Sequence, residues 1–369
     1  MLGKWIASPA LMTRSIRSRG WWGNLLSPSL QLFLALAFPV TTLAGGDNRI
    51  GTNAAPELLI PVGARDIALG GSNIATTNGI EAVYWNPAGL ARSQHNANAM
   101  FSHMNYIADI GVEYVAVSAG FEGFGTIAVS VKSISVGDIA ITTDDEPEGT
   151  GGTFNPTIVN VGLTFSRLLT DRISVGATAD LISERFDKVS ATGVAFNAGV
   201  QYNGFGGVNG LSVGVAVKNV GPSMQFQGDG LLRQQDVLTS NAMSRVTAAS
   251  FELPSTIELG MAYAVDIGEQ NSLNITSMFQ SNNFSMDEYK FGAEYSYDNT
   301  FFLRGGYVLP ESKTNNSLTV SDKTSFIYGF SAGAGIHYPV GTVDLAFDYA
   351  FRSVRFFQSS HVFAVTFGF

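Results

Sequence analysis

Histidine, carboxylate and serine side chains are the groups in this sequence that could do chemistry, but their spacing supports little of it. The four histidines are His95, His103, His337 and His361. Each lies in a different segment, and none has a second histidine or a carboxylate at the spacing of a zinc site. The chain has no cysteine, which excludes disulfides and thiolate metal sites. We therefore expect no metal site.

Catalysis and nucleotide binding find little support either. No G-x-S-x-G motif is present, and a lipase would need a Ser–His pair that geometry alone can reveal. The glycine-rich stretch 204–210, GFGGVNG, superficially resembles a phosphate-binding loop, but it joins two expected strands and no helix follows it, so we interpret it as a turn. The acidic run 144–148, DDEPE, is either a solvated loop or a site for divalent ions shared with lipopolysaccharide. We expect no enzymatic activity and no cofactor.

One dense motif remains, in residues 62–91. Its paired glycines permit backbone conformations closed to other residues, and Asn86-Pro87 followed by Gly89 marks a tight turn. These residues either only shape a turn or belong to a compact functional segment. Our candidate positions are Gly63, Arg65, Gly70, Gly71, Tyr84, Trp85, Asn86, Pro87, Gly89 and Leu90.

The composition indicates that much of the chain does not face water. Charged residues make up only 14% of the 369 residues, whereas glycines number 41 and aromatic residues reach 11%. This mixture is unusual for a soluble globular protein of this size. The net charge of −9 argues against nucleic acid as a partner.

The first 44 residues are typical of an export signal. Basic residues precede an apolar run at 30–40, and Thr42-Leu43-Ala44 supplies the small residues that a signal peptidase requires, so we expect cleavage before Gly45. The alternative is a membrane-anchoring helix, but the prolines at 28 and 39 enclose roughly ten residues where a span needs about twenty. Either Met1 or Met12 is the start.

From residue 96 onward the chain divides into segments with period-two alternation, separated by turn residues. In 171–185, for example, Ile173, Val175 and Leu181 share one face, while Ser174 and Asp180 share the other. A soluble sandwich would alternate in the same way. We expect fourteen strands, at 97–106, 111–121, 124–135, 155–168, 171–185, 192–203, 209–219, 254–267, 270–281, 287–297, 300–309, 324–338, 342–352 and 358–369.

The lengths of the connections favour a membrane barrel. Every second link is short, as at 122–123, 169–170 and 298–299, whereas 136–154, 220–253 and 310–323 are long. Alternating short and long links are typical of an outer-membrane barrel with periplasmic turns and outer loops. We therefore predict an all-β, antiparallel transmembrane barrel of fourteen strands over 96–369, with both ends of the chain in the periplasm.

Three further expectations follow from a barrel. A wide lumen and about fifty residues ahead of the first strand together predict that 45–95 forms an N-terminal hatch or plug. The alternating aromatics that end in Phe367 and Phe369 indicate an outer-membrane assembly signal read by the barrel-assembly machinery, although an ordinary closing strand would also fit. The apolar residues in the link 221–253 suit a lid, a partner-docking surface or a loop folded back on the barrel.

The motif also carries a resemblance to a known family. Residues 63–71 and 84–91, GARDIALGG and YWNPAGLA, resemble the PorV/PorQ family of the FadL-like outer-membrane β-barrel proteins, whereas the spacer Thr76 to Gly79 lacks the aspartates of many relatives. The resemblance implies a hatch inside the barrel, with the NPAG turn leading into the first strand.

Two functions follow from this resemblance. PorV-like proteins act in the type IX secretion system, where they receive exported proteins with a C-terminal signal domain. FadL-like proteins instead take up long-chain fatty acids or other hydrophobic small molecules. The expected partners are outer-membrane lipid and lipopolysaccharide, together with secreted proteins, secretion-system subunits or hydrophobic molecules.

Overall fold

The computed structural model describes residues 49–237, 240–311 and 326–369, with the backbone alone for 233–244. The expected signal segment 1–44 and residues 45–48 of the expected hatch lie outside this part of the chain. In the described ranges, no helix combines the length and the apolar character that crossing a membrane requires.

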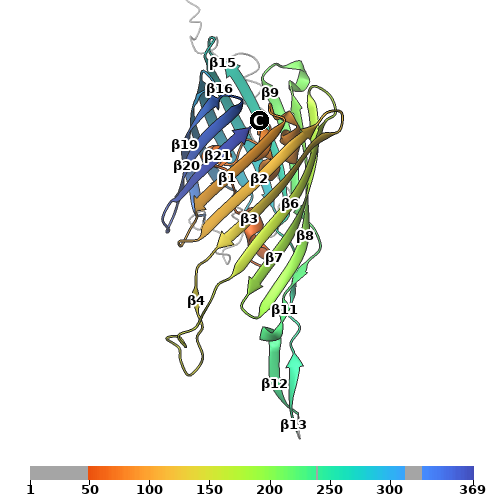
Figure 1. Ribbon diagram of the computed structural model, residues 1–369, viewed down its shortest axis with the longest axis vertical. Coiled ribbons are helices and arrows are strands. Elements are labelled where there is room, and N and C mark those ends of the chain that lie inside the picture. The colour runs from red at the N-terminus through yellow and green to blue at the C-terminus, as the bar shows by residue number, and fades with distance from the viewer. Residues whose placement is uncertain (1–48, 238–239, 312–325) are drawn as a thin grey trace, which may run out of the picture.

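Fourteen antiparallel strands close into one barrel (Figure 1). Each strand pairs with its sequence neighbour among the fourteen, and the first pairs with the last, which closes the barrel. The strands are β1 (Ala97–Asn105), β2 (Gly111–Phe121), β3 (Gly125–Ser135), β6 (Thr157–Leu168), β7 (Ile173–Phe186), β8 (Val189–Asn203), β9 (Leu211–Val220), β15 (Thr256–Asp266), β16 (Asn271–Asn282), β17 (Glu288–Tyr297), β18 (Phe301–Pro310), β19 (Tyr328–Val340), β20 (Val343–Val354) and β21 (Ser360–Gly368).

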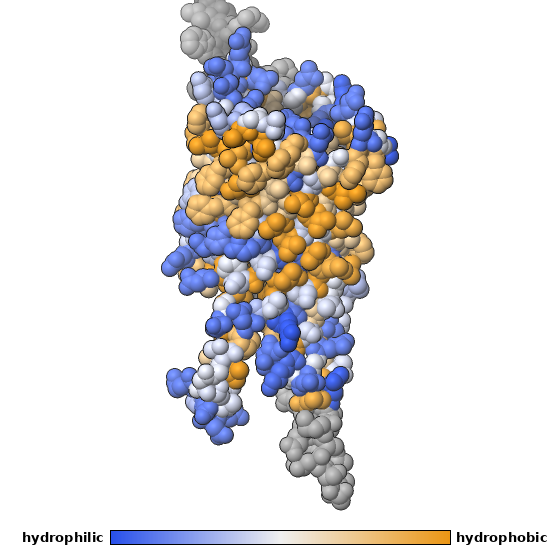
Figure 2. All heavy atoms as spheres, in the orientation of Figure 1, coloured by the Kyte–Doolittle hydropathy of each residue, from blue (hydrophilic) through white to orange (hydrophobic). Residues whose placement is uncertain are grey.

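The alternation places apolar side chains outside and polar side chains inside. On β6, Leu163 is 57% exposed on the outer face, whereas the inward Thr164 is fully buried. The same holds on β7, where Leu181 points outward and Ser174 is buried inside. Figure 2 shows an apolar belt on the visible face of the barrel, with polar residues toward both ends. A soluble sandwich would bury its apolar face, so this arrangement identifies a membrane barrel.

The predicted strands are confirmed in number, order and pairing, with ends displaced by a few residues. One link, expected at 186–191 between the strands at 171–185 and 192–203, is shorter than predicted. The connection between β7 and β8 is only residues 187–188, although it lies at the end with the long loops. These two strands, of 14 and 15 residues, continue the ladder beyond the barrel, so the extra length is strand and not loop.

Two excursions project from the long-loop end, opposite the end at which the C-terminus lies (Figure 1). The first is the link between β3 and β6, which contains β4 (Ile139–Ala140) and β5 (Thr153–Phe154). The second is the link between β9 and β15, in which β12 (Leu232–Val237) and β13 (Ser240–Arg245) form a hairpin. The same link contains the short strands β10 (Met224–Gln225), β11 (Gln227–Gly228) and β14 (Ser250–Phe251) and the turn η7 (Asp229–Leu231).

The link between β9 and β15 divides into two parts. Near its ends, Met224 and Leu253 are buried against Leu58 and Ile182, and β11 pairs with β8, so these apolar residues fold back on the barrel. The β12–β13 hairpin between them leaves the barrel. Of the three alternatives for this link, the folded-back loop therefore describes its two ends, whereas the hairpin does not fold back on the barrel.

Candidate functional site

Residues 49–96 form an N-terminal segment of short helical turns that packs against the inward faces of the strands. Its elements are η3 (Pro56–Leu59), α2 (Ala64–Ala68), η4 (Gly79–Glu81), α3 (Ala82–Trp85) and η5 (Pro87–Arg92). Gly63 precedes α2 with φ 83°, and Gly70 and Gly71 follow it with φ 67° and 75°. Because these angles strain side chains with a Cβ, the glycines of the motif set where the helical turns begin and end.

Glycines on the inner face of the barrel wall are in close contact with this segment. On seven strands an inward glycine lies so close to the segment that an added Cβ would overlap it. Gly306 lies against Gly70, and Gly199 lies against Asn86. We call this set the glycine collar; it comprises Gly176, Gly199, Gly214, Gly260, Gly292, Gly306 and Gly333. The collar lets two backbones approach each other at close range, which any larger residue would prevent.

A buried charge network ties α2 to β17, β18 and β20. Arg65 donates two hydrogen bonds to Glu294 on β17, at 3.0 and 3.1 Å. Arg304 on β18 donates to Glu294 at 2.6 Å and to Asp348 on β20 at 2.5 Å. His337 lies 3.4 Å from Asp348. The Arg304 side chain has no exposed surface, so its charge depends on these partners, and loss of one partner from a buried pair typically costs about 3–5 kcal/mol.

Asp66 organises the loop after α2. Its carboxylate accepts hydrogen bonds from Asn73 Nδ2 at 2.8 Å and from Thr77 Oγ1 at 2.7 Å. Burial raises the pKa of Asp66, against the opposing effects of Arg65 and these hydrogen bonds. Burial, reinforced by the nearby carboxylates of Asp66 and Asp348, raises the pKa of Glu81 well above its usual value. The part of the segment around α2 therefore combines the Arg65–Glu294 ion pair with two carboxyl groups, Asp66 and Glu81, whose pKa values are raised.

The NPAG turn anchors the segment next to the short turns. Asn86 Nδ2 donates to the carbonyl of Ile74 at 2.9 Å and to that of Val200 on β8 at 3.3 Å, and Asn86 Oδ1 accepts from Ala88 N at 3.2 Å. Pro87 follows as the first residue of η5, where its missing N–H is no loss. Asn86 thus both caps η5 and binds a strand, which is more than shaping an entry turn.

The aromatic pair of the motif lies between the segment and the wall. Trp85 Nε1 donates to the Val62 carbonyl at 3.0 Å, and Tyr84 donates to the Leu58 carbonyl at 3.2 Å. Lys218 lies 4.6 Å from the centre of the Tyr84 ring, and Lys132 lies 5.0 Å from it. Gly71 leaves room for the Trp85 ring, whose nearest atom would be 2.8 Å from an added Cβ.

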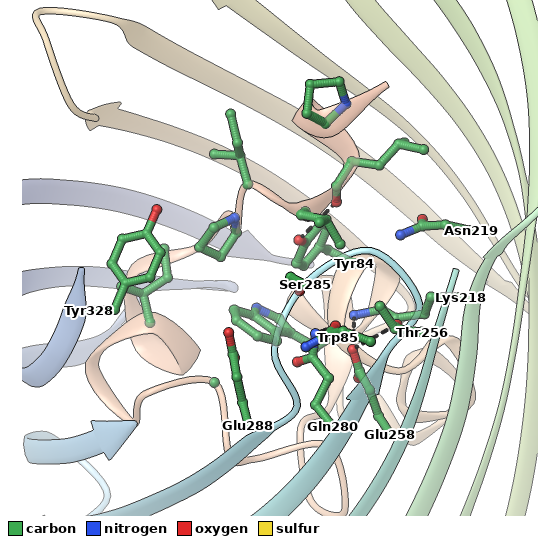
Figure 3. A pocket seen from close by; sticks show the side chains of 18 of the residues that line it. Tyr84, Trp85, Lys218, Asn219, Thr256, Glu258, Gln280, Ser285, Glu288 and Tyr328 are labelled. Carbon is green, nitrogen blue, oxygen red and sulfur yellow. Dashed lines mark hydrogen bonds and ion pairs between the residues drawn. The ribbon is translucent and has the colours of Figure 1, made fainter. Parts of the chain in front are cut away.

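A cavity of about 510 Å³ lies beside this aromatic pair and is lined by residues of the N-terminal segment and of the strands. Tyr328 lies at one side of it, and Lys218 with Glu258 lies at another (Figure 3). The guanidinium carbon of Arg352 lies 3.5 Å from the centre of the Tyr328 ring. The hydroxyl groups of Tyr328 and Tyr106 are hydrogen-bonded to each other at 2.5 Å.

The motif residues singled out in the sequence lie together in the N-terminal segment. Gly63, Gly71 and Trp85 are neighbours, Arg65 joins the charge network, and Gly70 contacts the collar. Gly89 lies against the Thr77 carbonyl, and Leu90 is fully buried. Phe367 and Phe369 lie apart from this group, on the outer face and at the C-terminus, 39% and 55% exposed.

Asp66, the strand residues of the charge network and the collar glycines were not among the residues predicted from the sequence. Asp66 lies inside the motif and is the single acidic residue of 62–71, a signal that could have identified it. A glycine at an inward position of successive strands is also a readable pattern, because glycine weakens a strand unless another backbone approaches it.

The sequence matches one model of a known protein family. A family model described as "Type IX secretion system protein PorV" matches residues 44–244. No curated protein matches the chain.

Solved structures share the fold at low sequence identity. The Pseudomonas putida toluene transporter TodX has 12% identity, with 83% of this chain and 97% of that chain covered and a TM-score of 0.52. The CymD monoaromatic hydrocarbon channel has 13% identity, with coverage of 84% and 98% and a TM-score of 0.51. These similarities concern the fold alone. The family model, however, spans more than half of the sequence, and the chain therefore belongs to the PorV family of outer-membrane β-barrel proteins.

Proposed function

We propose that this protein is a type IX secretion component that receives exported proteins at the cell surface. The observation that carries the proposal is the β12–β13 hairpin, which extends away from the barrel at the long-loop end (Figure 1). In outer-membrane barrels the long loops face the outside, so this hairpin is the arm that a partner outside the cell meets first. The match to the PorV model covers the arm up to residue 244.

The N-terminal segment favours a docking role rather than the role of an open pore. It contacts the collar glycines on seven strands and the charge network on β17, β18 and β20. A lumen crossed in this way suits a protein whose working surface lies at its outer end. We infer no chemical step, and hence no enzymatic activity, in this role.

The experiment removes the arm and leaves the barrel. Val246 N donates to the Leu231 carbonyl at 2.9 Å, so residues 232–245 can be replaced by a short glycine turn. We expect the variant to assemble normally, while an exported protein with a C-terminal signal domain shifts from the surface to the periplasm. Surface display and periplasmic accumulation of that protein are measured by protease accessibility in whole cells.

The matched control shortens the other excursion. Ile141 N donates to the Gly152 carbonyl at 2.9 Å, so residues 142–149 can be replaced in the same way, and this variant should keep display. Normal display without the β12–β13 hairpin would reject the hairpin as the docking arm.

A second candidate function is the uptake of long-chain fatty acids or other hydrophobic molecules. The observation that favours it is the cavity, onto which Leu58, Ile60 and Val83 turn apolar surface. Uptake of labelled laurate by cells that contain or lack the protein tests this candidate, and equal uptake would reject it.

A further inference from the structure

The cavity beside Tyr84 and Trp85 has two chemically different walls. The N-terminal segment supplies an apolar wall that includes Leu58, Ile60 and Val83 and the two aromatic rings. The strands supply a hydrogen-bonding wall that includes Asn160, Asn197, Thr256 and Gln280. The docking role proposed above uses neither wall, so the cavity calls for an explanation of its own.

The charged residues that line the cavity are of both signs, and most of them are matched within the protein. They are Lys132, Lys218, Lys290 and Arg352 against Asp180, Glu258 and Glu288. Lys218 Nζ lies 3.3 Å from Glu258 Oε1, and Lys290 Nζ lies 3.0 Å from Glu288 Oε2. Lys132 Nζ donates to the backbone carbonyls of Glu57 and Ile60, at 2.8 and 3.2 Å. Figure 3 shows the Lys218–Glu258 pair at the cavity. An anionic ligand would meet Asp180, Glu258 and Glu288, and a cationic ligand would meet the lysines and Arg352, so the lining as a whole complements neither sign of net charge.

Hydrogen-bonding capacity nevertheless remains at this wall. Asn160 on β6 is only 5% exposed, and neither its Oδ1 nor its Nδ2 has a partner in the protein. Glu258 Oε2 and Arg352 Nη1, also in the cavity lining, are likewise buried without a partner. The unpartnered atoms thus include both hydrogen-bond acceptors and hydrogen-bond donors. A purely hydrocarbon ligand would leave these groups desolvated, at about 1–3 kcal/mol for each neutral group.

A ligand that matches both walls is uncharged, has several groups that donate and accept hydrogen bonds, and has one face of C–H groups. Sugars have this combination, because each hydroxyl is both donor and acceptor while the ring presents C–H groups to an aromatic or aliphatic surface. The volume lies within the range of about 300–1,000 Å³ that is usual for small-molecule sites. We propose that this cavity binds an uncharged sugar of disaccharide size, with Asn160 as its principal hydrogen-bonding residue and the Tyr84–Trp85 pair at its C–H face.

The chain supplies its own reporter for a binding experiment. From residue 45 onward, Trp85 is the single tryptophan of the sequence, and it lines the cavity. The protein from residue 45 onward, reconstituted in phospholipid nanodiscs, is titrated separately with maltose, lactose, chitobiose, laurate and toluene. We expect a saturable change in Trp85 fluorescence with at least one of the three disaccharides and a smaller or absent change with laurate and toluene.

Variant Asn160→Leu removes the unpaired amide at nearly constant volume and should weaken disaccharide binding by about tenfold or more. The matched control is Asn274→Leu on β16, an inward asparagine that bonds Thr76 outside the cavity; it should leave binding unchanged. Heat-modifiable migration on a gel verifies folding, and Asn160→Ala replaces Asn160→Leu if the latter does not assemble. Three silent disaccharides, saturation by laurate or toluene alone, or equal binding by the Asn160 and Asn274 variants would each overturn the proposal.

Discussion

At the scale of single residues, the contact between Gly306 on β18 and Gly70 in the N-terminal segment shows how the two parts fit. An added Cβ at Gly306 would overlap the backbone of Leu69 and Gly70. We therefore expect Gly306→Ala to lower the free energy of unfolding by about 1–3 kcal/mol, because overpacking forces backbone shifts. The measurement is the urea-unfolding midpoint in detergent micelles, together with the rate of proteolysis within residues 49–96.

The neighbouring glycine provides the control for that substitution. Gly305 lies on the same strand, but an added Cβ there meets no atom within 4 Å. Gly305→Ala should change stability by no more than about 0.5 kcal/mol. Equal destabilisation by the two variants would mean that strand propensity, and not the collar, accounts for the effect.

Among the elements, the N-terminal segment is the one that could block the lumen of the barrel. Deleting residues 63–77 removes α2 and the Gly70-Gly71 turn but keeps Asn86 and Pro87. It vacates collar positions such as Gly306 and Gly292. The strands retain their ladder hydrogen bonds, so we expect a folded barrel with a raised single-channel conductance in planar bilayers.

Removal of residues 139–153, a stretch of equal length in the β4–β5 excursion, controls for the loss of chain and should leave the conductance at the level of the intact protein. The idea that the segment closes the lumen fails if the 63–77 deletion folds and conducts no more than this control.

At the scale of the whole molecule, closure depends on the seam between β1 and β21. The C-terminal residue takes part in it, because Asn96 N and Ala97 N both donate to the Phe369 carbonyl, and Phe369 N donates to Ala97. Phe369→Ser keeps these backbone bonds and removes only the aromatic ring. If the ring is read by the barrel-assembly machinery, this variant should show several-fold less heat-modifiable barrel in the outer membrane and more periplasmic aggregate.

Phe121, at the short-turn end of β2, is the matched position for that test. It is 52% exposed, close to the 55% of Phe369. Phe121→Ser changes the outer surface in the same way without touching the terminus and should assemble normally. Equal barrel levels for the two variants would show that the C-terminal ring is not an assembly signal.

The number of strands, their approximate limits and their topology could be predicted from the amino-acid sequence. Period-two alternation is a local property, set by the opposite directions of successive side chains in a strand, so the faces on 171–185 could be read without knowing any partner. The turn residues between the strands are local as well. The exception was the turn at 187–188, because where a ladder stops depends on both strands and not on one of them.

Which residues meet inside the barrel depends on how the whole chain folds and could not be predicted from local patterns. Arg65 pairs with Glu294, which is 229 positions away in the chain, and no local pattern connects them. The inward glycines are a pattern in the sequence, but the sequence does not show that Gly70 and Asn86 are what approaches them. The cavity and its unpaired Asn160 arise because a short segment crosses a wide closed barrel without filling it, and such a space depends on the relative positions of distant parts of the chain.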